Sequence, residues 1–280
     1  MLGAAPAAGA PGADAVTHGA YLAAAAGCDQ CHTDAKGGGK AYAGGRPLET
    51  AFGVIFPPNI TPDRETGIGR WRFADFVRAL RWGIAPDDSH YLPAFPFRFY
   101  NRLTDADLAD LKAFLDSVPA VRAVNRSGGP GILSAGRAKA AIAAIAGRFP
   151  GPWLADPSRD AAWNRGAYLV ATVGRCEDCH TPRNIFGAPD PRRRLAGASA
   201  GPGGKVVPNI TPDRETGIGK WSQQDIINVL KDGQTPEFDF VGGAMAEIVR
   251  NTSRLDDADR RAIAAYLKSL PAIRTQKKGR

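Results

Sequence analysis

Three stretches in the first half of the chain carry apolar residues at helical spacing. Residues 14–26 are alanine-rich and end before a glycine, which predicts a helix. Residues 73–82 place their apolar side chains on one face and predict a second helix. A third helix is predicted to begin after Thr104, a good N-cap residue, and to end before Pro119. Its apolar stripe and its hydrophobic staple involve Leu103, Leu108, Leu111, Phe114 and Leu115.

The same order of segments occurs a second time in the chain. The sequence PNITPDRETGIG at residues 58–69 is repeated without a change at residues 208–219, an offset of 150, and a tryptophan follows each copy. Further pairs are Gly19–Leu22 with Gly166–Leu169, Arg102–Asp107 with Arg254–Asp259, Phe114-Leu115 with Tyr266-Leu267, and Pro119 with Pro271. The pattern therefore predicts an all-α protein made of two tandem copies of one small helical domain.

The repeat divides the chain into five parts. We expect a leader or signal-peptide remnant at residues 1–13, a first domain at 14–119, a connector at 120–164, a second domain at 165–272 and a basic tail at 273–280. Ala13-Asp14-Ala15 has the form of a signal-peptidase site, and a disordered leader is the alternative interpretation. Within the connector, Ser134–Ile145 is predicted to form a short alanine-rich helix.

Composition indicates a globular chain, with 44% apolar and 23% charged residues among 280. No stretch reaches the roughly 18–20 apolar residues of a transmembrane helix, so none is expected. The net charge of +8 has two interpretations: it provides solubility, or it favours docking on an acidic redox partner or an anionic membrane surface. No nucleic-acid partner is expected.

The chemistry of the chain is concentrated in two pentapeptides, Cys28–His32 and Cys176–His180, both of the form C-x-x-C-H. They contain all four cysteines and two of the four histidines of the chain. This is the attachment signature of haem c, in which both cysteines bind the haem covalently and the histidine ligates its iron. A thioredoxin-like pair or half of a zinc site is the alternative for C-x-x-C alone, but the adjacent histidine and the duplication argue against both.

Two covalent haems are therefore predicted: haem 1 on Cys28 and Cys31 with His32 as axial ligand, and haem 2 on Cys176 and Cys179 with His180. Because bacterial haem c attachment takes place outside the cytoplasm, we expect an exported, periplasmic protein.

The sixth iron ligand distinguishes the two halves. A methionine is the usual distal ligand of an electron carrier, and only Met245 lies between the repeated segment and the last helix. The offset of 150 pairs Met245 with Phe95, which cannot bind iron and is expected in the distal pocket of haem 1. Haem 1 then lacks a sixth protein ligand or recruits another residue. His90 is the nearest candidate, followed by His18 and then Lys36, Lys40 and Tyr91; a surface or propionate-contacting role is the alternative for His90.

The repeated segment provides candidates for supporting contacts around each haem. A backbone carbonyl at Pro58-Asn59 or Pro208-Asn209 can accept the Nδ1 proton of the axial histidine. The indole N–H groups of Trp71 and Trp221 can reach a haem propionate, and core packing is the alternative for both.

These motifs resemble those of the periplasmic multihaem c-type cytochromes that accept electrons in membrane-associated alcohol, gluconate and related dehydrogenases. The resemblance rests on Arg165–Leu169, Cys176–Asn184, both PNITPDRETGIG segments with their tryptophans, and Leu92–Phe97. It implies two tandem cytochrome c-type domains, with iron ligation by His32, His180 and Met245. In that family the first haem is flanked by a P-A-M-P-like sequence, where this chain has Pro93-Ala94-Phe95-Pro96.

The leading hypothesis is a di-haem cytochrome c that passes electrons from a periplasmic dehydrogenase toward a cytochrome or terminal oxidase of the respiratory chain. It is compatible with peripheral association with a membrane or a larger complex. The alternative is a haem enzyme or sensor that uses an open distal site at haem 1 to bind peroxide, a small gas or a sulfur compound.

Overall fold

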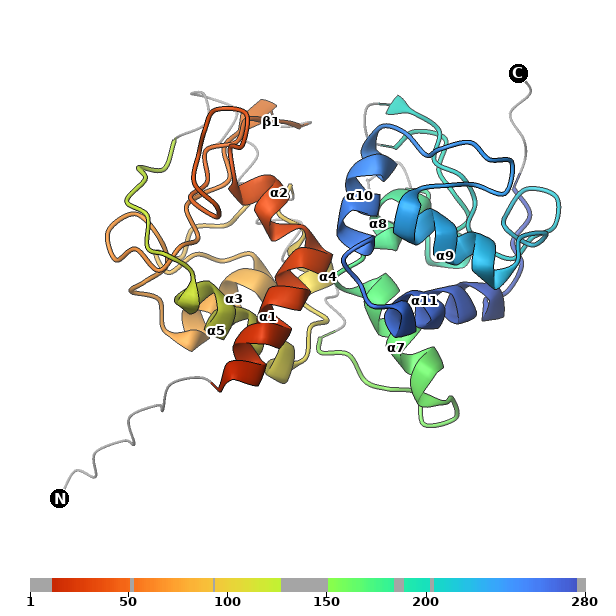
Figure 1. Ribbon diagram of the computed structural model, residues 1–280, viewed down its shortest axis with the longest axis horizontal. Helices are drawn as coiled ribbons and strands as arrows, with labels where there is room; N and C mark the ends of the chain where they lie inside the picture. The colour runs from red at the N-terminus through yellow and green to blue at the C-terminus, as the bar shows by residue number, and fades with distance from the viewer. Residues whose placement is uncertain are drawn as a thin grey trace. The chain divides into compact units, whose positions relative to one another are not determined.

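The computed structural model describes residues 12–50, 53–92, 94–126, 151–183, 189–201 and 204–275. The chain forms two compact units (Figure 1). Unit 1 is built from residues 1–23, 28–97 and 104–148, and unit 2 from residues 24–27, 98–103 and 149–280. The predicted leader residues 1–11, the predicted helix Ser134–Ile145 and the tail residues 276–280 lie outside the described part.

The first half of the chain is mainly helical. Its elements are α1 (Ala13–Ala26), α2 (Cys28–His32), β1 (Leu48–Thr50), β2 (Gly53–Ile55), α3 (Phe73–Trp82), α4 (Phe97–Tyr100) and α5 (Asp105–Ser117). Thr104 caps α5 by accepting a hydrogen bond from the backbone N–H of Asp107 through its side chain, as the sequence predicted. The antiparallel hairpin β1–β2, which pairs Leu48 with Ile55, is a small addition that the helical pattern did not indicate.

The second half repeats this order with α7 (Ala161–Ala171), α8 (Cys176–His180), the 3-10 helix η1 (Pro191–Arg193), α9 (Gln223–Asp232), α10 (Ala244–Thr252) and α11 (Asp257–Ser269). The all-α prediction is thus confirmed for both halves. Helix α7 begins at Ala161 because Asp160 caps it through the N–H of Trp163. Residues 161–164, which the sequence assigned to the connector, therefore belong to the first helix of the second domain.

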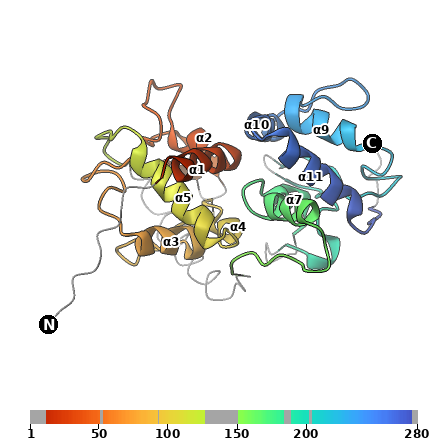
Figure 2. The same cartoon turned by 60° about the horizontal axis from the view of Figure 1, so that its bottom comes forward.

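In each unit the first and last long helices cross at a glycine. In unit 2, where α7 packs against α11 (Figures 1 and 2), a Cβ added to Gly166 would lie 2.0 Å from the carbonyl oxygen of Ala262. In unit 1 a Cβ added to Gly19 would lie 1.9 Å from the carbonyl oxygen of Asp110. Only a residue without a side chain permits this approach, which explains why the repeated Gly-Ala-Tyr-Leu begins with glycine.

The segment that follows the last helix of each unit is a structural part of that unit. The side chain of Asn59 donates to the carbonyl of Val121 at 2.7 Å, and Asn209 donates to the carbonyl of Ile273 at the same distance. The sequence placed Val121 in the connector and Ile273 in the tail. The recurrence of Pro119-Ala120 as Pro271-Ala272 just before them was the available signal.

Within the described ranges of the chain, none of the helices has the length and apolar character required to cross a membrane.

Candidate functional site

The imidazole of the histidine in each C-x-x-C-H motif is oriented by a distant backbone carbonyl. The Nδ1 atom of His32 lies 2.7 Å from the carbonyl oxygen of Pro58, and that of His180 lies 2.8 Å from the carbonyl oxygen of Pro208. A carbonyl can only accept, so each Nδ1 carries the proton and each Nε2 keeps its lone pair for a metal.

The backbone of each histidine is held as well. The carbonyls of His32 and His180 accept hydrogen bonds from the N–H groups of Gly44 and Gly197, at 2.8 and 2.7 Å. Both glycines have a left-handed φ, of 77° and 81°. A Cβ on Gly44 would lie 2.5 Å from the carbonyl carbon of Pro58, so the close approach of the two loops requires glycine. Neither glycine was predicted to support a site, although both follow an alanine in the two copies.

The protonation state of both imidazoles suits metal ligation. Burial lowers the pKa of His32 and of His180, and the bonds to the proline carbonyls oppose this effect only in part. The residue His180 is 8% exposed. Both rings are therefore held in the neutral form, which is the form that binds iron.

The cysteines fit thioether attachment better than thiolate chemistry. None of the four is in a disulfide, and in each motif both cysteines and the histidine lie on one short helix, α2 or α8. Burial, followed by the charge of Glu177, raises the pKa of Cys176 to about 12, and burial also raises the pKa of Cys179. A redox-active pair or a zinc site needs thiolates, and burial disfavours the thiolate form at Cys176 and Cys179. The two thiols outside any disulfide and the oriented neutral imidazole together form the donor set of a haem c site.

Asn59 and Asn209 support the loops that carry the two proline carbonyls. The Oδ1 atom of Asn209 accepts from the backbone N–H of Thr211 at 2.9 Å and from its hydroxyl at 2.7 Å. Asn59 makes the same bonds to Thr61, at the same distances. All four side chains are buried. The repeated segment therefore fixes the position of Pro58 and Pro208, and through them the orientation of the imidazoles.

Trp71 and Trp221 occupy equivalent, half-buried positions next to the repeated segment. Among the residues that the structure describes, neither indole N–H has a hydrogen-bond partner. Both donors thus remain available for an acceptor such as a propionate.

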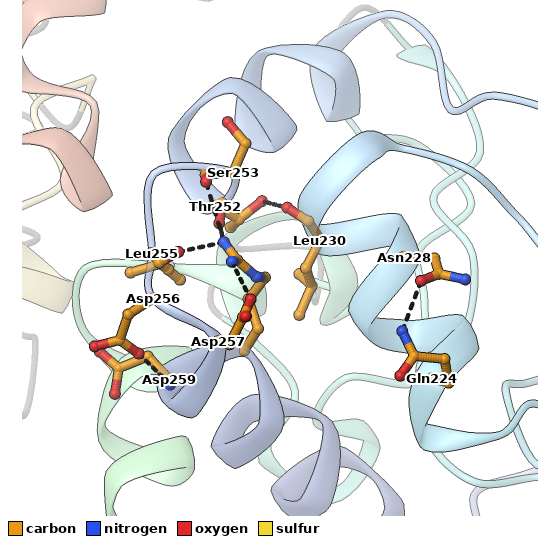
Figure 3. A network of polar contacts seen from close by, with 10 residues as sticks. Gln224, Asn228, Leu230, Thr252, Ser253, Leu255, Asp256, Asp257 and Asp259 are labelled. Carbon is orange, nitrogen blue, oxygen red and sulfur yellow. Dashed lines mark hydrogen bonds and ion pairs between the residues drawn. The ribbon is translucent and has the colours of Figure 1, made fainter.

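Met245 lies in the first turn of α10, and the other end of this helix is held by a buried arginine. The guanidinium of Arg260, which is 5% exposed, donates to the carbonyls of Thr252 and Ser253 at 3.1 and 3.0 Å, and also to that of Leu255. Figure 3 shows Thr252 and Ser253 at the C-terminal end of α10 and Leu255 in the segment that follows. The Thr252 hydroxyl donates to the Leu230 carbonyl of α9 at 2.6 Å. The role of Arg260 was not predicted from the sequence, because it depends on how α10 and α11 meet in the folded structure.

The equivalent region of unit 1 differs. Phe95 packs edge-to-face on Tyr91, with ring centroids 5.5 Å apart. Nδ1 of His90 is inaccessible to solvent and has no hydrogen-bond partner among the described residues. His18 lies on α1, and its Nδ1 atom is hydrogen-bonded to Oδ2 of Asp110 at 2.8 Å.

The remaining candidates for the distal side of haem 1 are less suitable. Lys36 and Lys40 lie in the exposed loop after α2. Burial, with a smaller contribution from the charge of Asp87, raises the pKa of Tyr91 to about 12, so its phenolate form is disfavoured.

Comparison with known proteins agrees with this donor set. The family model described as Cytochrome c matches residues 16–119 and 164–271. A diheme cytochrome c-type protein of Cereibacter sphaeroides is 44% identical over 257 residues, which are 89% of this chain and 83% of the relative. The fructose dehydrogenase cytochrome subunit of Gluconobacter japonicus is 40% identical, over 92% of this chain and 53% of the relative.

The cytochrome c subunit of a quinone-dependent alcohol dehydrogenase from Gluconobacter oxydans is 35% identical, over 92% of this chain and 55% of the relative. The chain thus spans about half the length of these two dehydrogenase subunits. The matches confirm the resemblance to dehydrogenase-associated cytochromes and the presence of two covalently bound haem c groups.

Proposed function

Because the chain belongs to the cytochrome c family and binds two haem c groups, we propose that it carries electrons from a periplasmic dehydrogenase toward the respiratory chain. Electron transfer itself follows from the family and from the relatives, several of which are cytochrome subunits of dehydrogenases. The donor, the acceptor and the compartment are the proposed part. One observation supports the proposal: a single chain has two equivalent proximal sites, whereas the segments after α3 and α9, which carry Phe95 and Met245 and are called the distal loops below, differ.

The proposed residues follow the two units. Haem 1 is attached to Cys28 and Cys31 with His32 as axial ligand. Haem 2 is attached to Cys176 and Cys179, with His180 and Met245 as its two axial ligands. When bound, each haem supplies a one-electron Fe(III)/Fe(II) couple.

The side chains of this protein set the properties of that couple. The Pro58 and Pro208 carbonyls hold the imidazoles in one tautomer and increase their basicity, which stabilises Fe(III). The thioether of Met245 favours Fe(II) and raises the potential of haem 2. Arg260 holds the C-terminal end of α10 and thereby limits the movement of Met245. Different distal ligands in the two units give two potentials, and these favour electron flow in one direction.

The test is a redox titration of the purified holoprotein together with reduction by a purified sugar or alcohol dehydrogenase. We expect two haems per chain by pyridine haemochrome assay, two distinct potentials and rapid reduction of both haems by the dehydrogenase. In Met245→Ala, the near-infrared charge-transfer band of methionine-ligated ferric haem should disappear while both haems remain attached. A single redox-active haem, or no reduction by any dehydrogenase of this class, would contradict the proposal.

Localisation has its own test, because export is required for the proposed partners. Cell fractionation with antibody detection should recover the haem-stained protein with periplasmic markers. Recovery with cytoplasmic markers would remove a periplasmic dehydrogenase as the donor.

A further inference from the structure

The two distal loops have the same backbone structure from Gly83 to Tyr91 and from Gly233 to Val241. The N–H of Tyr91 donates to the carbonyl of Gly83 at 2.7 Å, and the N–H of Val241 donates to that of Gly233 at 2.9 Å. The equivalent left-handed residues are Asp88 and Phe238, and the equivalent bridges are Ile84–His90 and Gln234–Phe240. The offset of 150 therefore holds in three dimensions through Tyr91, and His90 occupies the position of Phe240.

Beyond this point the two loops separate. Gly243 has a φ of 59°, which a proline ring cannot adopt, and the sequence of unit 1 has Pro93 at that position. The second half of the chain then forms the nine-residue helix α10 from Ala244, whereas the first half forms the four-residue helix α4 from Phe97. We therefore expect the distal ligand of haem 1 to lie in the part of the loop that the two units share, which ends at Tyr91.

His90 is the residue in the shared part whose chemistry is unexplained. Its Nδ1 atom is excluded from solvent and has no hydrogen-bond partner among the described residues. A buried ring nitrogen without a partner is unfavourable unless another group binds the ring. The equivalent Phe240 is 70% exposed and has no ligand atom. The two loops thus exchange roles: unit 1 has a histidine and Phe95 where unit 2 has a phenylalanine and Met245.

We propose that a ring nitrogen of His90 is the sixth ligand of the haem 1 iron. The inference rests on the proposed attachment of haem 1 to Cys28, Cys31 and His32. Haem 1 then has two imidazole ligands, whereas haem 2 has an imidazole and a thioether. Since the thioether raises the potential, haem 1 has the lower potential, and electrons enter at haem 1 and leave from haem 2.

The test is the spin state and ligand set of each haem in the full-length holoprotein, measured by EPR and near-infrared magnetic circular dichroism. The wild-type protein should show two low-spin ferric haems in equal amounts, one bis-histidine and one histidine–methionine. In His90→Ala, one haem should become high-spin and its ferrous form should bind carbon monoxide, while the histidine–methionine signal is unchanged. His18→Ala, which removes the histidine bonded to Asp110, is the matched control and should leave both signals as in wild type.

A second variant keeps the test decisive if His90→Ala folds poorly. In His90→Met, a thioether replaces the imidazole, and a second charge-transfer band of methionine-ligated haem should appear. The inference is overturned if wild-type haem 1 is high-spin and binds carbon monoxide, which is the open-site alternative, or if His90→Ala remains low-spin at both haems. In either of these cases, reduction of both haems by a dehydrogenase would leave the proposed electron-transfer function intact, so the two failures are distinguishable.

Discussion

Whether Gly166→Ala raises or lowers the free energy of unfolding depends on the close crossing of α7 and α11 at this glycine. Gly166→Ala replaces the glycine in the middle of a helix, and on helix propensity alone it should stabilise the protein by about 1 kcal/mol. However, the new Cβ would lie 2.0 Å from the Ala262 carbonyl oxygen and 2.8 Å from Cβ of Tyr266. Real Cβ contacts are essentially never shorter than 3.0 Å, so the helices must move apart by about 1 Å.

The magnitude follows from that displacement. A gap of about 1 Å removes a quarter to a half of each dispersion contact, and overpacking of this kind costs roughly 3 kcal/mol. The gain in propensity offsets only part of this cost, so we expect a net loss of about 2 kcal/mol in the free energy of unfolding of unit 2. The loss should be largely confined to unit 2, because the residues in contact with Gly166 belong to that unit.

The measurement is guanidinium unfolding of the holoprotein, followed by far-UV circular dichroism and by the charge-transfer band expected from Met245. Ala162→Gly, at an exposed position of the same helix, is the control and should lose at most about 1 kcal/mol. If Gly166→Ala is as stable as wild type or more stable, the close crossing of the helices is refuted.

Three further variants test other parts of the structure. Asn209→Ala removes the shorter of the two hydrogen bonds to the Ile273 carbonyl and the acceptor of the Thr211 N–H, and it should cost about 3 kcal/mol in chemical unfolding; an unchanged midpoint would exclude a structural role for that segment. Arg260→Leu should lower stability by about 2–3 kcal/mol and weaken the charge-transfer band of Met245, and a normal band would show that α10 needs no such support. Phe238, 80% exposed with a φ of 62°, is strained, so Phe238→Asn should raise stability by about 1 kcal/mol by thermal unfolding; destabilisation would indicate that its ring has a packing role.

Local features of the sequence predicted much of the fold. The helix expected at residues 73–82 has those bounds in the structure, and the helix expected at 14–26 begins one residue earlier. Both depend on apolar spacing and on the residues at the helix ends, which act within a few residues of the chain. The hairpin β1–β2 was missed because its two short strands carry too few residues for an alternating pattern to be recognised.

Long-range contacts were beyond such reasoning. The recurrence of Pro-Ala before Val121 and Ile273 marks these segments as equivalent, but it does not identify their hydrogen-bond partners, because the donating asparagines lie more than 60 residues away. The unequal lengths of α4 and α10 were also not predicted. The C-terminal end of α10 is held by the guanidinium of Arg260, a residue of α11, and this contact forms only in the folded structure.

The covalent chemistry can be predicted from the sequence alone, because C-x-x-C-H places both thiols and the imidazole on one five-residue helix. Duplication of the motif likewise predicted two domains and two haems. The folded structure sets how each imidazole is oriented, since its carbonyl partner lies 26 or 28 residues along the chain. It also singled out His90, because a nitrogen without a partner can be recognised only when every neighbouring donor and acceptor has been placed.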